Sequence, residues 1–337
     1  MKKIKNNIII IGILTFLLLY FVLKDNFNEI INVLFNSDYK YVLLMFLIMI
    51  IAEFIKSLAL FYITKGIKKD YTIIKAFKLQ LETNFFNGIT PFALGGQPFQ
   101  LYIMKRNSNI GYTNGVNILF EDFFCYQLAL VILYILFIVI NKIFNLLFIP
   151  KLTHKLLIIG GLINILIIIF LIFLAFSKGR YNKFVDKMIT FLSKLKIVKD
   201  KNKTINKIND SICQFKEQVY AMNKNYKVII RSIVLNIVRF LLFGIIGYLS
   251  FKAVDVSGVN VSVCIIAIVF IIVMAAFIPI PGSSGGMEFG FVSLLSIYAL
   301  DVKLMAAMIL WRFVHYYFPM IFGACLFLFE KREKVWE

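Results

Sequence analysis

Ionisable side chains occur inside segments of this chain that are otherwise long and apolar. Glu53 and Lys56 lie three residues apart in one such segment, Glu121 and Asp122 adjoin in another, and Arg239 lies in a third. A charge at the centre of a bilayer costs roughly 2.5–3.5 kcal/mol on insertion scales. We therefore expect these side chains to face one another or a polar cavity, and the spacing of Glu53 and Lys56 allows these two to pair.

A second group of polar residues lies near the C-terminus. Arg312, His315 and Tyr316 are spaced to share one helix face, and Glu288 lies upstream, just after two glycines. One unpaired buried charge is much more costly than two that meet, so we predict that Glu288 lies near Arg312. Arg312 could then hold a phosphate, or hold Glu288 until a phosphate displaces it. Ion pairs that only fix helix packing are the alternative interpretation.

Two short motifs share the pattern P-x3-G-G-x2-F and are 190 residues apart. They are Pro91–Phe99, with Gly95 and Gly96, and Pro281–Phe289, with Gly285 and Gly286. Non-helical backbone at membrane depth is tolerated only where it is packed in protein or lines a wet cavity. The N-terminus of a helix after such a break favours an anion such as phosphate. Broken segments at matching places in two halves indicate a transporter site; breaks that merely let helices cross closely are the other possibility.

Composition places these motifs in a membrane protein. Of 337 residues, 61% are apolar and 16% are charged, and about 20 apolar residues suffice to cross a bilayer as a helix. Six runs are predicted to span the membrane: 7–23, 41–64, 113–140, 156–176, 228–251 and 303–329. Gly and Pro interrupt two further apolar stretches, 71–104 and 261–300. We expect an all-α polytopic membrane protein with six spans and two opposed re-entrant hairpins.

The same pattern predicts one integral membrane domain over 1–337. Its halves, about 41–176 and 227–329, form an inverted repeat in which the two hairpins enter from opposite faces. Between them, 177–227 is expected to be a basic amphipathic cytoplasmic loop that meets anionic lipid or a cytosolic partner.

The formal net charge is +19, from 37 Lys and Arg against 18 Asp and Glu. In a membrane protein this excess is typical of the positive-inside rule and of attraction to anionic lipid, and no nucleic acid is expected. The basic segments fall on one side if both termini are cytoplasmic. Segment 141–155 is the exception, because it carries Lys142, Lys151 and Lys155 on the side predicted to be external.

No catalytic or metal site is evident in the sequence. Two histidines cannot make a three-His zinc site, and the four cysteines contain no CxxC pair. Phosphate-binding P-loops and G-x-S-x-G elbows are absent too. We expect no metal and no cofactor.

The broken segments resemble the signatures of a known family. Residues 84–102, NFFNGITPFALGGQPFQLY, are followed by Lys105-Arg106, and residues 280–288, IPGSSGGME, are followed by Trp311-Arg312 and Tyr316-Tyr317. Both resemble the lysylphosphatidylglycerol synthase transmembrane, or flippase-like, family, which includes the membrane half of the multiple peptide resistance factor. The resemblance implies a bacterial plasma membrane, resistance to cationic peptides, and movement of aminoacylated phosphatidylglycerol between leaflets.

This sequence departs from the family pattern in two respects. Many members carry an acidic residue and an arginine after the first Gly-Gly, where this chain has Gln97 and Gln100. Full-length members also have a C-terminal cytosolic domain that transfers lysine from lysyl-tRNA to phosphatidylglycerol, and this chain is expected to lack it.

The resulting hypothesis is a flippase-like protein that translocates an anionic phospholipid or a lipid-linked headgroup. The alternatives are a phosphatidylglycerol lysyltransferase, or a membrane subunit of lysyl-phosphatidylglycerol synthesis, and a membrane scaffold that docks a cytosolic partner. The residues expected to bind substrate are Pro91, Gly95, Gly96, Gln97, Gln100, Pro281, Gly285, Gly286, Glu288, Arg312 and Tyr316, with Glu53, Lys56, Glu121 and Arg239 in supporting positions.

Overall fold

The structure is a computed structural model. It describes residues 27–90, 95–176, 226–275, 278, 280–299 and 301–333. The predicted first span at 7–23, Pro91, and nearly all of the predicted basic loop lie outside the described residues. The remaining predictions can be compared with the structure directly.

The described chain is built from helices alone. In order they are α2 (Phe27–Phe35), α3 (Tyr39–Ile67), α4 (Ile73–Gly88), α5 (Gly96–Ser108), α6 (Tyr112–Phe144), α7 (Lys151–Phe176), α10 (Tyr226–Ala253), α11 (Val261–Ala275), α12 (Gly286–Leu295), α13 (Asp301–Arg312) and α14 (Phe318–Glu333).

Five helical segments of the described chain are long and apolar enough to cross a membrane. They are 39–67, 112–144, 151–173, 226–253 and 301–329. Five of the six predicted spans are therefore confirmed, each to within five residues at its start. Together with the helical content, they confirm an all-α polytopic membrane protein.

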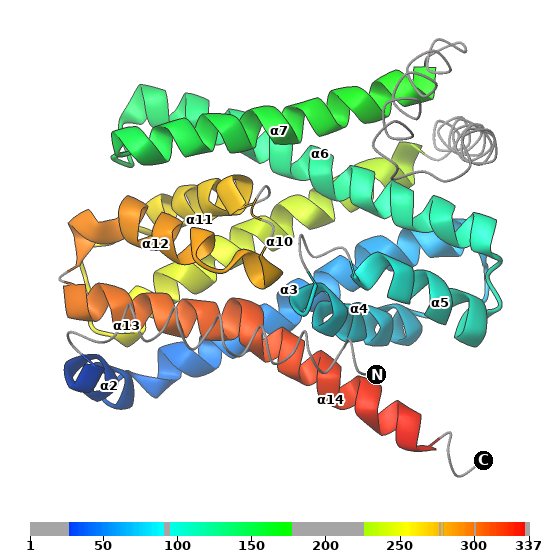
Figure 1. The fold of residues 1–337 in the computed structure, drawn as a ribbon, viewed down its shortest axis with the longest axis horizontal. Coiled ribbons are helices and arrows are strands. Elements are labelled where there is room, and N and C mark those ends of the chain that lie inside the picture. The colour runs from blue at the N-terminus through cyan, green and yellow to red at the C-terminus, as the bar shows by residue number, and fades with distance from the viewer. Residues whose placement is uncertain are drawn as a thin grey trace, which may run out of the picture.

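The two interrupted stretches each form a pair of short helices. The first break, at 89–95, separates α4 from α5, and the second, at 276–285, separates α11 from α12. Figure 1 shows α4 and α5 in one half of the molecule and α11 and α12 in the other, with both breaks toward its centre. The hairpins thus enter from opposite ends, as predicted. The boundaries of the two repeat halves stay a prediction.

Long helices hold these hairpins in place. α3 packs along α10 and also contacts α4, while α10 packs on α11. The contact between α10 and α11 is close because Gly244 lies against the backbone of Ile265, where a Cβ atom would collide. Small residues that let backbones approach are the usual means by which membrane helices pack.

The last span contains a defect at its centre. Between α13 and α14, residues Phe313–Tyr317 form a π-helical turn, and Pro319 follows within α14. Single π-helical turns inside α-helices occur often at functional sites. This turn contains His315 and Tyr316 and begins directly after Arg312, so it positions the polar face singled out from the sequence.

The opposed hairpins give a topological prediction. In a variant whose four native cysteines are replaced, single cysteines at Lys105 (end of α5) and Asp301 (start of α13) should react with an impermeant maleimide from opposite sides of the membrane. Labelling in intact cells and in inverted vesicles measures this. Reaction of both positions from the same side would contradict the arrangement of the hairpins.

Candidate functional site

A cavity of about 590 Å³ lies between the two hairpins and the long helices. Its volume falls within the range of ordinary ligand pockets, roughly 300–1,000 Å³. Helices α3 to α7 and α10 to α14 all contribute to its wall. The polar and charged residues that line it are Glu53, Lys56, Gln80, Thr83, Asn84, Asn87, Gln97, Gln100, Asp122, Tyr126, Gln127, Arg239, Ser283, Arg312, His315 and Tyr316.

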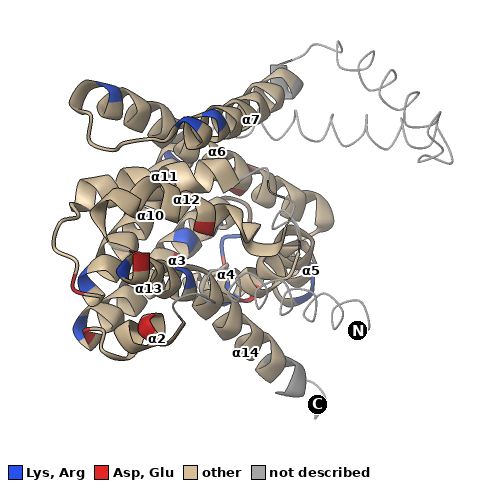
Figure 2. Cartoon of the chain, turned by 60° about the vertical axis from the view of Figure 1, so that its left-hand side comes forward, with Lys and Arg blue, Asp and Glu red and all other residues tan. Residues whose placement is uncertain are grey.

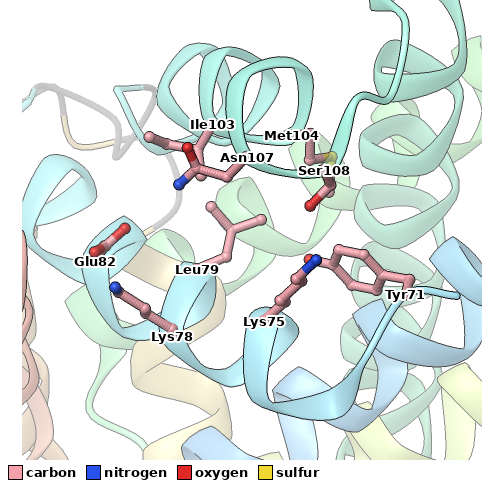
Figure 3. A pocket seen from close by; sticks show the side chains of 9 residues that line it. All are labelled: Tyr71, Lys75, Lys78, Leu79, Glu82, Ile103, Met104, Asn107 and Ser108. Carbon is pink, nitrogen blue, oxygen red and sulfur yellow. The ribbon is translucent and has the colours of Figure 1, made fainter. Parts of the chain in front are cut away.

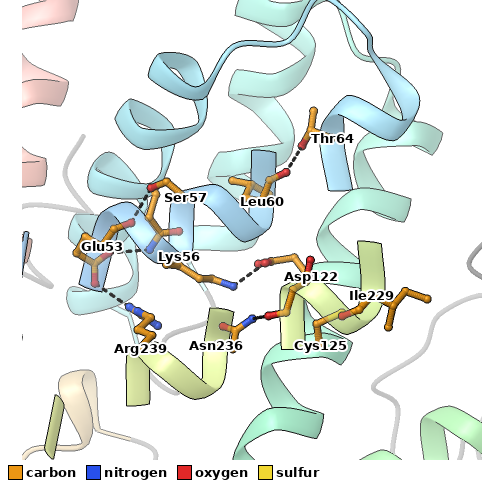
Figure 4. A network of polar contacts seen from close by, with 12 residues as sticks. Glu53, Lys56, Ser57, Leu60, Thr64, Asp122, Cys125, Ile229, Asn236 and Arg239 are labelled. Carbon is orange, nitrogen blue, oxygen red and sulfur yellow. Dashed lines mark hydrogen bonds and ion pairs between the residues drawn. The ribbon is translucent and has the colours of Figure 1, made fainter. Parts of the chain in front are cut away.

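Glu53 is the centre of the first polar network in this wall. One carboxylate oxygen accepts a hydrogen bond from Arg239 at 2.7 Å (Figure 4). The other accepts bonds from Gln80 at 3.0 Å and Asn84 at 2.8 Å. Glu53 itself is only 2% exposed. This network ties α3 to α10 and to α4, and it satisfies a carboxylate that would otherwise be costly to bury.

Lys56 has a different partner from the one that its spacing suggested. Its ammonium group binds Asp122 of α6 at 2.6 Å, whereas Glu53 pairs with Arg239. The predicted option of a Glu53–Lys56 pair is therefore wrong. Both residues lie on α3, but each reaches across to a neighbouring helix, so the two ion pairs fasten α3 to α10 and α6.

Arg312 forms the third ion pair, and here the sequence prediction is confirmed. Its Nε donates to Glu288 at 2.8 Å, and its Nη2 donates to the carbonyl oxygen of Gly282 at 2.5 Å. Glu288 uses its other oxygen to accept the backbone N–H of Gly285 at 2.7 Å. The guanidinium therefore joins α13 to the second break, while Glu288 caps the start of α12.

Side chains near the two breaks bind backbone N–H groups of the Gly-Gly motifs. The N–H of Gly95 donates to Thr90 at 2.8 Å, and the N–H of Gly96 donates to Asn87 at 3.0 Å. With Gly285 bonded to Glu288, three N–H groups expected to hold an anion are already occupied. None of Gly95, Gly96, Pro281, Gly285, Gly286 or Glu288 is among the described residues that line this cavity. Their hydrogen bonds shape the breaks, and a direct role in binding substrate stays a prediction.

Tyr316 connects the two breaks across the cavity. Its hydroxyl donates to the carbonyl oxygen of Gly88, at the end of α4, at 2.8 Å. Arg312 lies over the Tyr316 ring at 4.3 Å. Gly282 has a φ of 63° and lies against the same ring, so that a Cβ there would collide with it. One side chain thus contacts both hairpins.

Several buried polar atoms around the cavity have no partner among the described residues. They include Nε of Arg239, Nη1 of Arg312 and Nδ1 of His315, and all three residues line the cavity. His315 itself packs between the rings of Phe243 and Trp311. A buried donor without a partner carries a penalty of about 1–3 kcal/mol, more for a charged group. The two arginine N–H groups are donors that suit a ligand with acceptor oxygens.

The structure brings together part of the expected site. Gln97, Gln100, Arg312, Tyr316, Glu53, Lys56 and Arg239 all line the cavity, while Glu121 does not, although it adjoins Asp122. No role was predicted for Gln80 or Gly282, and Asn84 and Asp122 were not among the residues expected to bind substrate. Gln80, Asn84 and Asn87 lie at spacings of four and three on α4, and this polar stripe in an apolar segment is a signal that could have identified them.

A smaller cavity between α4 and α5 is not the site. Lys75, Lys78, Glu82 and Tyr71 converge on it (Figure 3), but its volume is about 50 Å³. This volume is far below the roughly 300–1,000 Å³ of ordinary ligand pockets, so the space is too small for a phospholipid headgroup.

The chain was compared with known proteins. A family model described as "Lysylphosphatidylglycerol synthase TM region" matches residues 7–323. A comparison with curated proteins gives no match. The family match covers both hairpins and every residue that lines the cavity.

The buried pairs predict a stability test. Lys56→Met should lower the free energy of unfolding by about 3–5 kcal/mol, because it leaves Asp122 charged and unpaired in the bundle. The double variant Lys56→Met/Asp122→Asn should recover most of this loss. Unfolding in mixed detergent micelles measures both. Lys68→Met, at an exposed pair of 3.5 Å with Asp70, is the control and should cost less than about 1 kcal/mol. A Lys56→Met loss as small as this control would contradict the interpretation.

Proposed function

Because this chain belongs to the lysylphosphatidylglycerol synthase transmembrane family, we propose that it moves an anionic phospholipid headgroup between leaflets through the cavity. The family supports a multi-pass membrane protein involved in the synthesis or the flipping of lysylphosphatidylglycerol. Our proposal is the finer one: translocation of a phosphate-bearing headgroup, with the acyl chains remaining in the lipid around the bundle.

The observation that carries this proposal is a pair of unpartnered donors on two arginines that line the cavity. Arg239 and Arg312 each keep a buried N–H without a partner among the described residues, while a different nitrogen of each guanidinium binds a carboxylate. Arginine donates in a planar fork that matches phosphate oxygens. The two guanidinium groups can therefore accept a phosphate without first breaking their ion pairs.

Amide side chains supply the rest of the polar surface. Gln97 and Gln100 project from α5, and Gln127 lies on α6, with its Nε2 bonded to Asn164 at 2.5 Å. Neutral amides both donate and accept, so they can replace the water around glycerol hydroxyls. A headgroup crossing the bilayer needs its hydration replaced in this way along the whole path.

The two hairpins offer a means of opening the cavity to one side at a time. They enter from opposite ends, and Tyr316 bonds the end of the first while its ring contacts the second. Transporters with inverted repeats work by moving one repeat against the other around a fixed central site. We propose that the π-helical turn at 313–317 takes up this movement, because its backbone bonding is already irregular.

The location and the physiological role that we propose are those that the family resemblance implies. The protein would lie in a bacterial plasma membrane with both termini cytoplasmic, and it would contribute to resistance against cationic peptides by changing the lipid of the outer leaflet. A cytosolic partner at 177–227 stays a prediction, since nearly all of that segment lies outside the described residues.

A second candidate function is a part in lysylphosphatidylglycerol synthesis, and the family description itself favours it. Aminoacyl transfer requires an acid or base within about 3 Å of the reacting groups. Glu53 and Asp122, which line the described cavity, and Glu288, which binds Arg312, are each held by a cation. Because each of these carboxylates is held in an ion pair, the cavity favours binding of a ligand over proton transfer by these groups.

Flipping by purified protein is the first test of function. In liposomes, the wild-type chain should speed the movement of fluorescent phosphatidylglycerol between leaflets, and Arg312→Gln should reduce that rate at least tenfold, because it removes both the phosphate donor and the link to Gly282. Dithionite quenching of the outer leaflet measures the rate. Arg231→Gln, an exposed arginine on the same bundle, is the matched control. Wild-type flipping by folded Arg312→Gln protein would refute the role of this residue.

Synthesis is tested separately. The purified chain, given lysyl-tRNA and phosphatidylglycerol, should form no lysylphosphatidylglycerol above background by mass spectrometry. Production of that lipid by the wild-type chain, and its loss on Glu288→Gln or Asp122→Asn, would replace the transport proposal with the enzymatic one.

A further inference from the structure

The end of the hairpin formed by α6 and α7 carries positive charge that the central cavity does not use. Lys142 lies in the last turn of α6, and Lys151 and Lys155 lie at the start of α7, all three exposed. From residue 123 to residue 185 the sequence contains no Asp or Glu. In Figure 2, by contrast, blue and red occur together around α2 and α13. These three lysines are the exception to the charge distribution predicted from the sequence.

The lysines on α7 also stand at the unfavourable end of their helix. A helix N-terminus carries a partial positive charge and favours acidic side chains, but the first turn of α7 has none. Lys151, His154 and Lys155 therefore add cationic or neutral groups where the backbone is already electropositive. Local rules of this kind are broken most often at functional sites, and an anion bound here would remove the conflict.

A cavity of about 470 Å³ opens at the same place. Asn141, Lys142, Asn145 and His154 form its polar part, while its apolar part includes Ile158 of α7 and Phe270 of α11. The cavity is thus divided into a cationic, hydrogen-bonding part and an apolar part, which is the division found in a phospholipid.

The loop that forms the polar part is held in one shape by its own bonds. The side chain of Asn141 donates to the carbonyl oxygen of Leu147 at 3.0 Å and accepts from the N–H of Leu147 at 2.7 Å. Tyr298 donates to the carbonyl oxygen of Leu146 at 3.2 Å, and Leu147 is buried. The cavity is therefore formed in advance, and binding need not order the loop.

The length of α6 allows the end that carries this cavity to reach the membrane surface. Its 33 residues span about 50 Å at 1.5 Å per residue, whereas the hydrocarbon core is about 30 Å thick. Phe144 and Phe148, exposed by 66% and 64%, lie beside the lysines. Exposed apolar rings next to cations are typical of segments that enter the headgroup layer.

We infer that this cavity is a separate binding site for an anionic glycerophospholipid. Lys142 and His154 would contact the phosphate, with Lys151 and Lys155 adding to the local positive potential, and one acyl chain would lie along Ile158 and Phe270. The inference does not rest on transport through the central cavity. It also explains why a cationic loop occurs at the end of the bundle where the charge pattern predicts few cations.

Lipid retention by the full-length protein tests this site. Native mass spectrometry of protein extracted from nanodiscs with equal phosphatidylglycerol and phosphatidylcholine should show preferential retention of phosphatidylglycerol. The triple variant Lys142→Gln/Lys151→Gln/Lys155→Gln should reduce that preference at least fivefold. Lys65→Gln/Lys68→Gln/Lys69→Gln removes the same charge elsewhere and should leave the preference unchanged. An equal loss in both variants would overturn the proposal in favour of general charge attraction.

A second variant tests whether lipid retention requires the cavity or only the positive charge at the surface. Ile158→Trp keeps every charge but fills the apolar part, so it should also reduce retained phosphatidylglycerol. Full retention by folded Ile158→Trp protein would overturn the proposal. Because flipping is measured separately in liposomes, loss of lipid at this site with normal flipping, or the reverse, distinguishes the two proposals.

Discussion

The guanidinium group of Arg312 is the interaction on which the rest of the site depends. It binds Glu288 and the Gly282 carbonyl at once, and its plane lies over the ring of Tyr316. Glu288 in turn caps α12, and Tyr316 bonds the end of α4. The two breaks between helices are thereby fixed relative to the last span. In lipid, such breaks exist only where protein satisfies them, and Arg312 supplies much of that satisfaction.

The same constraint explains the charge balance of the cavity. Lys56, Arg239 and Arg312 are each matched by a carboxylate at 2.6–2.8 Å. A cavity that held three free cations would bind a phosphate too tightly to release it, and it would also be costly to fold. Paired cations with spare donors hold a phosphate more weakly. A transport site needs moderate binding of this kind, because the ligand has to leave as well as enter.

Much of this arrangement was predictable from the sequence, for identifiable reasons. The apolar runs and the Gly and Pro breaks indicated helices and hairpins because lipid permits few other structures. Glu288 and Arg312 could be paired in advance since neither can be buried alone and Glu288 adjoins a break. The partners of Glu53 and Lys56 could not be predicted in this way. Arg239 and Asp122 lie on other helices, and their contacts depend on the rotation of α3 against α10 and α6.

The roles of the glycines were also beyond the sequence. A helix start after Gly-Gly predicts free N–H groups, but Thr90, Asn87 and Glu288 occupy those of Gly95, Gly96 and Gly285. Gly282 was passed over, although its left-handed backbone and its contact with Tyr316 exclude any side chain there. Side chains that cap a break are set by tertiary packing, and short motifs do not reveal them.

The central claim is that the cavity between the hairpins holds the phosphate of an anionic lipid. The most direct measurement is a cryo-electron microscopy structure of the full chain in phosphatidylglycerol nanodiscs. The account predicts density for a phosphate in the cavity, with oxygens about 2.7–2.9 Å from Nη1 of Arg312 or Nε of Arg239. A cavity filled by water or by an acyl chain alone, with every resolved headgroup at the membrane surface, would contradict it.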